Sequence, residues 1–390
     1  MDKILIVGAG ISGLSCAYYL KKNGLSPTIY ESSSSYGGKI KTETIDDFLL
    51  DYGFQVLLNN YKEIKRMGCY ENLNINYFDS GASIFHENKK ENIYNPLYHP
   101  IKFLKSDFTS FFTLTDIYRI LRLLVSNPSP GTSTNKYLNK YLSDSLNHLF
   151  IKPFFRGIFL DDDLQNDLVF FKKLIKKFIF GKAGLPKLGM QELPKSIIEM
   201  GHLKRINYNK KLVKIDGDYA LFNDNDSHRF DKIILALPIH ITSKILNLNV
   251  SFSYNSNSTF YFTSDKNVLT KAISLLPDTN FKSNSLQCLT NISKSYSPKG
   301  KFLYSLASNK YNLNLERAKY EFELITSLKT HEYCFLKSYN IKNALPKKTK
   351  IISSGNEKIH LCGDWSNEPS IDGAVKSGRL TAEAILKESF

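Results

Sequence analysis

The fold is decided by the stretch KILIVGAGISGLSCAYYLKKNGLSPTIYE, residues 3–31. Residues 4–7 are apolar, so residues 3–7 predict a buried strand, and after a glycine-rich turn residues 13–23 have the pattern of a helix. Residues 26–31 then predict a second strand, which completes a β–α–β unit. Such a unit is typical of a parallel, doubly wound sheet, so we expect an α/β protein with a Rossmann-like domain.

The turn of this unit carries a dinucleotide-binding fingerprint. Gly8, Gly10 and Gly13 have the spacing G-x-G-x-x-G directly after the strand. The first glycine permits the tight turn, the second lets the backbone approach a pyrophosphate, and the third lets helix and strand pack closely. The amino end of the helix, at Ile11 and Ser12, offers unpaired N–H groups and partial positive charge to the phosphates. The alternative is that the glycines serve packing alone.

An acidic residue ends the second strand. Glu31 lies about 20 residues beyond the fingerprint, where a carboxylate accepts hydrogen bonds from an adenosine ribose. The same carboxylate would repel a 2′-phosphate, so NADP is disfavoured at this site. The fingerprint and Glu31 together do not separate NAD from FAD.

Features of a nucleotide-binding domain occur in three separate parts of the chain. They lie at the start, around residues 205–238, and in the tail from residue 358, which predicts a strand, a turn and a long helix. The parts between them have other sequence patterns, with longer helical stretches and mixed regions, so we predict a discontinuous domain that carries an inserted α+β substrate domain. The predicted boundaries are 1–62, 190–248 and 346–390 for the nucleotide-binding domain and 63–189 and 249–345 for the substrate domain.

Composition limits the class of protein. The 390 residues are 42% hydrophobic, enough to bury a large core. The five cysteines form no CxxC pair, the histidines show no metal-ligand spacing, and no stretch approaches the ~20 apolar residues that cross a bilayer. We therefore expect a cytoplasmic protein without a metal site. The net charge of +15 is spread along the chain without a nucleic-acid-binding motif, so we expect no nucleic-acid partner.

The residues after Glu31, SSSSYGGKIKTETIDDFLLDYGFQVL, resemble the flavin-containing amine oxidoreductase superfamily. Members of that family carry two glycines and a basic residue after the acidic residue, and Gly37, Gly38 and Lys39 match this pattern. Arginine is usual at the third position, and a lysine lacks its bidentate fork, so phosphate contact should be looser. The resemblance implies that the Rossmann-like domain is an FAD-binding domain. The sequence contains no SGGC-like segment for covalent attachment of the flavin, so we expect FAD to be held noncovalently.

Two further segments carry the resemblance. Gly363 and Asp364 are similar to the family's GD motif, which contacts the pyrophosphate and ribityl part of FAD. Residues 372–375 are similar to the start of the closing helix, whose backbone amides face the pyrimidine edge of the flavin; a helix amino end there would stabilise negative charge on the reduced ring. The matched residues of this helix are Asp372, Gly373, Ala374 and Val375.

The resemblance also covers the middle of the chain. Val213 matches the position whose backbone meets adenine. Gly53, Phe54 and Gln55 match the segment beside the flavin ring, where a glycine permits close approach; the alternative is a turn into a buried strand.

Within the superfamily, the sequence favours the desaturase-like and protoporphyrinogen-oxidase-like branches. Residues 368–371 lack the aromatic residue that amine oxidases commonly place before the final helix, and residues 152–164 and 183–197 resemble bacterial phytoene-desaturase-like oxidoreductases. We therefore expect an enzyme that oxidises an apolar, isoprenoid-like or polycyclic small molecule by hydride transfer to flavin N5, with an unspecified electron acceptor and no identifiable catalytic residue. The alternatives are a redox-neutral isomerase that uses reduced FAD, an amine oxidase, and a binding module without catalysis.

One segment suggests contact with a membrane. LVFFKKLIKKFIF, residues 168–180, predicts a helix with an apolar face opposite four lysines, which is typical of helices that lie in a membrane interface. The alternative is that this face lines the core of the substrate domain while the lysines are solvated.

Overall fold

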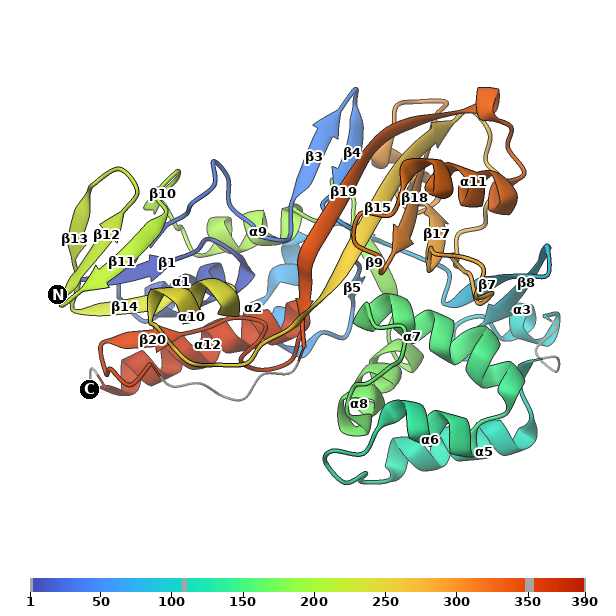
Figure 1. The fold of residues 1–390 in the computed structure, drawn as a ribbon, viewed down its shortest axis with the longest axis horizontal. Coiled ribbons are helices and arrows are strands. Elements are labelled where there is room, and N and C mark those ends of the chain that lie inside the picture. Colours follow the sequence, from blue (N-terminus) through green and yellow to red (C-terminus); the bar gives the residue numbers. More distant parts are fainter. Residues whose placement is uncertain (1–2, 107–110, 348–353, 389–390) are drawn as a thin grey trace.

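The computed structural model describes residues 3–106, 111–347 and 354–388. One end of the molecule, on the left in Figure 1, is built on a five-stranded sheet in the order β10–β2–β1–β14–β20. All its neighbouring strands are parallel, and they come from three separate parts of the chain, as the discontinuous Rossmann-like fold requires. The strands are β1 (Ile4–Val7), β2 (Thr28–Tyr30), β10 (Ile206–Asn207), β14 (Lys232–Leu235) and β20 (Ile359–Leu361).

Helices pack closely on this sheet. The predicted first helix is α1, Ile11–Lys22, and it contacts the long C-terminal helix α12, Ile371–Glu388. Gly378 of α12 makes the close approach possible, because a Cβ there would lie 2.2 Å from the carbonyl oxygen of Ser12. The other helices of this part are α2 (Lys62–Met67), α9 (Glu192–Met200) and α10 (Ile239–Ile245).

A small antiparallel sheet lies beside the parallel one. It consists of β11 (Leu212–Asp216), β12 (Tyr219–Phe222) and β13 (Ser227–Arg229). The ring of Phe222 stacks on that of Tyr30, with centroids 4.5 Å apart, so the small sheet is joined to the end of β2.

The second large sheet lies in the part predicted to be the substrate domain and has the order β19–β15–β18–β17–β16–β7–β8. Helix α11, Leu315–Thr326, covers one face, where Phe322 stacks on Phe262 with centroids 4.4 Å apart. The opposite face carries Tyr261, which joins the hydrophobic core of the nucleotide-binding part. The strands are β7 (Gly81–His86), β8 (Lys89–Tyr94), β15 (Tyr254–Ser264), β16 (Ile273–Leu275), β17 (Ser285–Cys288), β18 (Phe302–Ser308) and β19 (Tyr333–Pro346).

Short elements connect the two large sheets. Strands β5, β9 and β6 form a small three-stranded sheet in which β9 pairs with both neighbours. Strand β5 comes before the boundary predicted after residue 62, and β6 and β9 come after it, so the sheet combines strands from both predicted domains. The domain boundaries therefore stay a prediction. The short strands are β3 (Thr42–Ile45), β4 (Phe48–Asp51), β5 (Leu57–Leu58), β6 (Ile75–Tyr77) and β9 (Ala183–Pro186), and the short helices are η1 (Cys69–Asn72), η3 (Leu289–Asn291), η4 (Lys294–Tyr296) and η5 (Thr330–Glu332).

A helical lobe with its own core hangs below the second sheet in Figure 1. Aromatic side chains fill this core, and Phe155 and Phe171 lie at its centre with ring centroids 4.5 Å apart. The lobe consists of α5 (Leu114–Val125), α6 (Thr134–Tyr141), the π-helix η2 (Ser145–Ile151), α7 (Lys152–Phe159) and α8 (Leu168–Ile179), while the short helix α3 (Pro100–Leu104) contacts β8.

Helix α8 contains the basic amphipathic segment. Its apolar side chains Phe171, Leu174 and Ile175 are buried in the lobe's core, which is the packing alternative. On the other face, Lys173 pairs with Glu368 and Lys177 with Asp372, at 2.7 and 3.1 Å, instead of being simply solvated. Membrane contact through residues 168–180 stays a prediction that this geometry does not favour. Within the described ranges, no helix combines the length and the apolar character needed to cross a membrane.

The substitution Gly13→Ala tests the close packing of α1. A Cβ at Gly13 would lie 2.0 Å from the carbonyl oxygen of Gly8, so α1 must move, and overpacking of this kind costs about 1–3 kcal/mol. We expect a lower thermal midpoint and loss of bound cofactor. Gly157→Ala in α7 is the matched control, since its Cβ would meet nothing within 4 Å and alanine favours the helix. Equal midpoints for both variants would contradict the packing argument.

Candidate cofactor site

The fingerprint glycines fall into two classes in the structure. Gly8 has a φ of +107°, and a Cβ there would lie 2.4 Å from the carbonyl oxygen of Ala236. A Cβ at Gly13 would likewise lie too close to the carbonyl oxygen of Gly8. A Cβ at Gly10 would instead meet only the Cα of Gly38, at 3.9 Å. Packing therefore demands the first and third glycines, while the second leaves open space for a ligand to approach the backbone.

The amino end of α1 is available to an anion. Gly10 is its N-cap residue and supplies no side chain to cap it, and the first turn contains no acidic residue. The N–H groups of the first turn, at Ile11, Ser12 and Gly13, have no carbonyl partner within a helix and carry its partial positive charge. This arrangement suits a pyrophosphate.

Glu31 is held beside the fingerprint by hydrogen bonds to both carboxylate oxygens. Its Oε2 accepts from the N–H of Ala9 at 2.7 Å, and its Oε1 accepts from the N–H and the hydroxyl of Ser33 at 2.9 and 2.8 Å. The side chain is buried where β1 and β2 end, at the edge where ligands of such sheets bind. The predicted contact with ribose therefore fits this geometry.

The GGK segment lies directly on the fingerprint turn. Gly37 donates its N–H to the carbonyl oxygen of Ala9 at 2.8 Å, and Gly38 adopts a φ of +62°. Lys39 then reaches the tail of the chain, because its Nζ lies 3.3 Å from Oδ2 of Asp364. Two motifs 325 residues apart in the sequence are thus in contact at one site.

The GD turn is fixed from α12. Gly363 donates its N–H to the hydroxyl of Ser377 at 2.9 Å. Trp365 beside it is buried and donates its indole N–H to the carbonyl oxygen of Leu237 at 2.9 Å, so the single tryptophan has a packing role here.

The segment matched to the flavin ring contains an unsatisfied acceptor. The side-chain nitrogen of Gln55 donates to the carbonyl oxygens of Lys39 and Tyr52, at 3.0 and 3.2 Å. The Oε1 atom of Gln55 is buried and accepts no hydrogen bond from any residue the structure describes. Since buried polar atoms are nearly always paired, a ligand with a donor group fits this position. Gly53, with a φ of +87°, and Phe54, which packs edge-on against Phe78, complete the segment.

The start of α12 has partners within the protein. Oδ1 of Asp372 accepts from the N–H of Glu63 at 2.8 Å, at the amino end of α2, and Oδ2 pairs with Lys177. Gly373 donates its N–H to the hydroxyl of Ser370 at 3.0 Å, and the N–H of Ala374 donates to the Ser370 carbonyl at 2.9 Å. Contact of Asp372, Gly373, Ala374 and Val375 with the flavin stays a prediction, and the Asp372 carboxylate has a structural role.

Val213 lies at an irregularity in the small antiparallel sheet. The pairing of β11 with β12 shifts between Leu212 and Lys214, so Val213 has no directly opposite residue in β12. Such a bulge leaves an extra residue unpaired. This is compatible with the predicted backbone contact to adenine.

Sequence reasoning missed a buried carboxyl group next to the flavin segment. Asp51 accepts hydrogen bonds from the hydroxyls of Thr42 and Tyr296, at 2.6 and 2.8 Å, and from the N–H of Met190 at 2.9 Å. Its carbonyl oxygen accepts from the hydroxyl of Tyr261 at 2.7 Å. Burial raises the pKa of Asp51 to about 6, against the effect of the three hydrogen bonds. Nothing in FLLDYG distinguishes this aspartate from an exposed turn residue.

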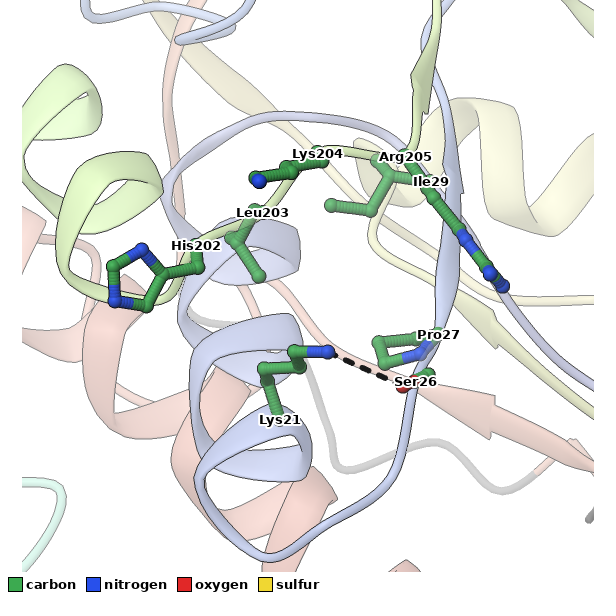
Figure 2. A pocket seen from close by; sticks show the side chains of 8 residues that line it. All are labelled: Lys21, Ser26, Pro27, Ile29, His202, Leu203, Lys204 and Arg205. Atoms are coloured by element: carbon green, nitrogen blue, oxygen red, sulfur yellow. Dashed lines mark hydrogen bonds between the residues drawn. The ribbon is translucent and has the colours of Figure 1, made fainter.

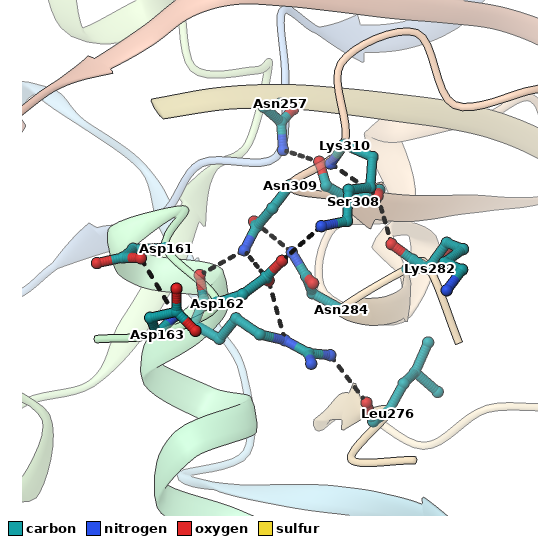
Figure 3. Close-up of polar contacts among 12 residues, drawn as sticks. Asp161, Asp162, Asp163, Asn257, Leu276, Lys282, Asn284, Ser308, Asn309 and Lys310 are labelled. Carbon is teal, nitrogen blue, oxygen red and sulfur yellow. Dashed lines mark hydrogen bonds and ion pairs between the residues drawn. The ribbon is translucent and has the colours of Figure 1, made fainter. Parts of the chain in front are cut away.

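A polar junction connects the helical lobe to the sheet above it (Figure 3). Asp162 accepts from Lys310 and Asn309 at 2.8 and 2.9 Å and lies 3.7 Å from the guanidinium of Arg156. Asn257 belongs to the same set of contacts and lies against Gly53, since its Oδ1 would be 3.5 Å from a Cβ there. The lobe is thus linked to the segment beside the predicted flavin position.

A basic pocket of about 240 Å³ lies elsewhere (Figure 2). It is lined at the amino end of β2 by Pro27 and Ile29 and on the other side by residues 202–205. The fingerprint lies at the carboxyl ends of the strands, so this pocket is not part of the cofactor site.

The substitution Lys39→Met tests the contact between the GGK and GD motifs. We expect FAD to bind roughly 10 to 100 times more weakly, because one charged contact with phosphate contributes about 1.5–3 kcal/mol. Lys39→Arg should bind FAD more tightly than the wild type, since arginine contacts phosphate with two parallel hydrogen bonds. Fluorescence titration of the apoprotein measures this, with the exposed Lys299→Met as the control. Unchanged affinity in Lys39→Met would refute the assignment.

The substitution Asp51→Asn tests the buried carboxyl group. The folded-state pKa of about 6 lies above the unfolded value of about 3.9, so ionisation of Asp51 opposes folding. Its contribution to stability is fully present below pH ~4 and falls as pH rises through ~6, by roughly 3 kcal/mol in total. Asparagine does not titrate, so the stability of the variant relative to wild type should rise between pH 4 and 7 in urea unfolding. The exposed control Asp47→Asn should show no such trend. If the difference in stability between Asp51→Asn and wild type did not change with pH, the raised pKa of Asp51 would be contradicted.

Comparisons with known proteins identify the family of this chain. A family model described as flavin containing amine oxidoreductase matches residues 11–258. Protoporphyrinogen oxidase of Dictyostelium discoideum is 27% identical over 188 residues, which cover 42% of this chain and 35% of the relative. The 4,4′-diaponeurosporene oxygenase of Staphylococcus aureus is 34% identical over 58 residues, 15% of this chain and 12% of the relative. These matches thus span about a third or less of the curated relatives.

The fold is shared along the whole chain. The crystal structure of an oxidoreductase from Methanosarcina mazei matches with a TM-score of 0.77 at 17% identity, covering 99% of this chain and 100% of that one. The open space at Gly10, the uncapped amino end of α1 and the unsatisfied Gln55 fit a bound FAD. With more than half of its residues matched by the family model, this chain belongs to the flavin-containing amine oxidoreductases.

Proposed function

We propose that this enzyme oxidises an uncharged, largely apolar small molecule of the polycyclic or isoprenoid kind. When bound, FAD supplies a hydride acceptor at its N5 atom. The names of the two curated relatives, a protoporphyrinogen oxidase and a diaponeurosporene oxygenase, support a substrate of this class.

The observation that carries the proposal is the chemical character of one face of the seven-stranded sheet. Phe260 and Phe262 point to the α11 side, so the alternating Tyr261 points the other way and reaches Asp51, two residues before Gly53. This face is therefore turned toward the flavin segment. Two rows of directly opposed residues cross the inner strands of this face without a charged side chain: Tyr261, Ser305 and Gln287 in one, and Thr259, Ala307, Ser285, Leu275 and Ile84 in the other. Charged residues occur only where the rows reach the edge strands, at Lys337 of β19, which pairs with Glu43, and at Glu91 of β8.

A sheet face whose inner strands carry no charged side chain does not suit an amine substrate. An ammonium group needs a carboxylate or an aromatic cage to replace its hydration. The stretch before α12 supplies neither, because residues 368–371 contain no aromatic ring and Glu368 is paired with Lys173. The sheet face and the stretch before α12 together therefore favour a neutral substrate.

The protein's own part in the reaction is positioning and exclusion of water. Gly53 lets a ligand approach the backbone, the sheet face holds the substrate, and the junction around Asp162 fixes the helical lobe on that sheet. Holding the reacting carbon close to the acceptor supplies much of the rate without a charged side chain. We assign no side chain as a base.

An anaerobic reduction assay tests the proposal. The visible spectrum of the purified holoenzyme is followed on addition of coproporphyrinogen III, protoporphyrinogen IX, a C30 polyene, putrescine or benzylamine. We expect a tetrapyrrole or the polyene to bleach the flavin and the amines to leave it oxidised. Bleaching by amines alone would overturn the proposal. Turnover only after prior reduction, with no acceptor consumed, would instead identify a redox-neutral isomerase.

A further inference from the structure

Helix α5 exposes a continuous apolar face. Leu114, Tyr118, Leu121 and Val125 are 87%, 61%, 57% and 81% exposed, and their spacing places them on one side of the helix, with Ile117 beside them. The opposite side of α5, with Leu123 and Leu124, is buried in the core of the helical lobe. The exposed apolar side chains are therefore not needed for folding of the lobe, and large exposed apolar patches mark interaction sites.

The charge around this face is mainly positive. Between residues 111 and 142 the single acidic residue is Asp116, which is buried and accepts hydrogen bonds from Thr113 and Ser143; the exposed Asp144 follows shortly after this range. The basic residues of the same range are Arg119, Arg122, Lys136 and Lys140. Net exposed charge here is thus positive, whichever way the side chains turn.

The position of α5 leaves the face accessible. In Figure 1, α5 and α6 lie side by side at the lower end of the helical lobe, on the far side from the five-stranded sheet. Arg119 of α5 donates to the carbonyl oxygen of Tyr141 at the end of α6, so this end of α6, which carries the exposed Lys140, lies against α5.

We propose that this face of α5 docks the protein on the surface of an anionic phospholipid bilayer. The exposed leucines, Tyr118 and Val125 would enter the interfacial region, and Arg122 with the lysines of α6 would contact lipid phosphates. A symmetric dimer through the same face is disfavoured, because it would bring like charges of the two copies together. The docking helix is α5 and not the segment 168–180, whose apolar face is already buried.

Co-sedimentation with vesicles tests the proposal. The holoenzyme is mixed at 50 mM salt with vesicles of phosphatidylcholine and phosphatidylglycerol in equal parts, or of phosphatidylcholine alone. We expect binding to the anionic vesicles, weakened by 0.5 M salt. The double variant Leu121→Ser/Val125→Ser should bind at least tenfold more weakly. The matched control is Tyr320→Ser/Leu324→Ser on α11, where the exposed fractions are 55% and 39%; it should bind like the wild type.

Three results would overturn the proposal: no binding to anionic vesicles, equal binding by the α5 and α11 variants, or a concentration-dependent dimer that the α5 variant alone loses. Circular dichroism and flavin absorbance establish that both variants are folded. The assay uses no substrate, so its result does not depend on whether the proposed function is correct.

Discussion

The amino end of the first helix can serve as a phosphate site only because side chains are missing where its neighbours meet it. Gly13 lies against the carbonyl oxygen of Gly8, and Gly378 brings α12 onto the same helix at the carbonyl oxygen of Ser12. Of the three fingerprint glycines, Gly10 is the one beside which a ligand has room. One close-packed arrangement of β1, α1 and α12 thus positions the uncapped helix end, and the rest of the cofactor site is built around it.

Charge pairs then join parts of the chain that are far apart in the sequence. Lys39 meets Asp364 across the site, and Arg379 of α12 makes two hydrogen bonds to buried Glu63 of α2, at 2.7 and 3.1 Å. Asp372 accepts from the N–H of Glu63 as well, which favours the amino end of α2 electrostatically. Removing one member of such a buried pair leaves an uncompensated charge, so these contacts fix how the C-terminal helix sits against the start of the chain.

Much of this arrangement could be predicted from the sequence, because the decisive signals are local. The fingerprint around Gly10, the strand before it and the acidic end of β2 are short patterns with a fixed geometric meaning. Asp51 could not be predicted, since its burial depends on Tyr296 and Met190, which are distant in the chain. The amphipathic pattern of residues 168–180 was also ambiguous, because a sequence shows that a helix has an apolar face but not what covers it. The role of Asp372 at α2 is likewise a product of tertiary structure.

The most direct test of this account is hydrogen exchange of the apoprotein with and without FAD, measured by mass spectrometry on overlapping peptides. We expect FAD to slow exchange of the backbone amides in residues 8–16, at the uncapped end of α1, and in residues 31–39 and 53–57, which surround it. Residues 202–205, at the basic pocket on the opposite edge of the sheet, should exchange unchanged. Protection confined to residues 202–205, or no protection of residues 8–16, would contradict the assignment of the glycine turn as the phosphate site.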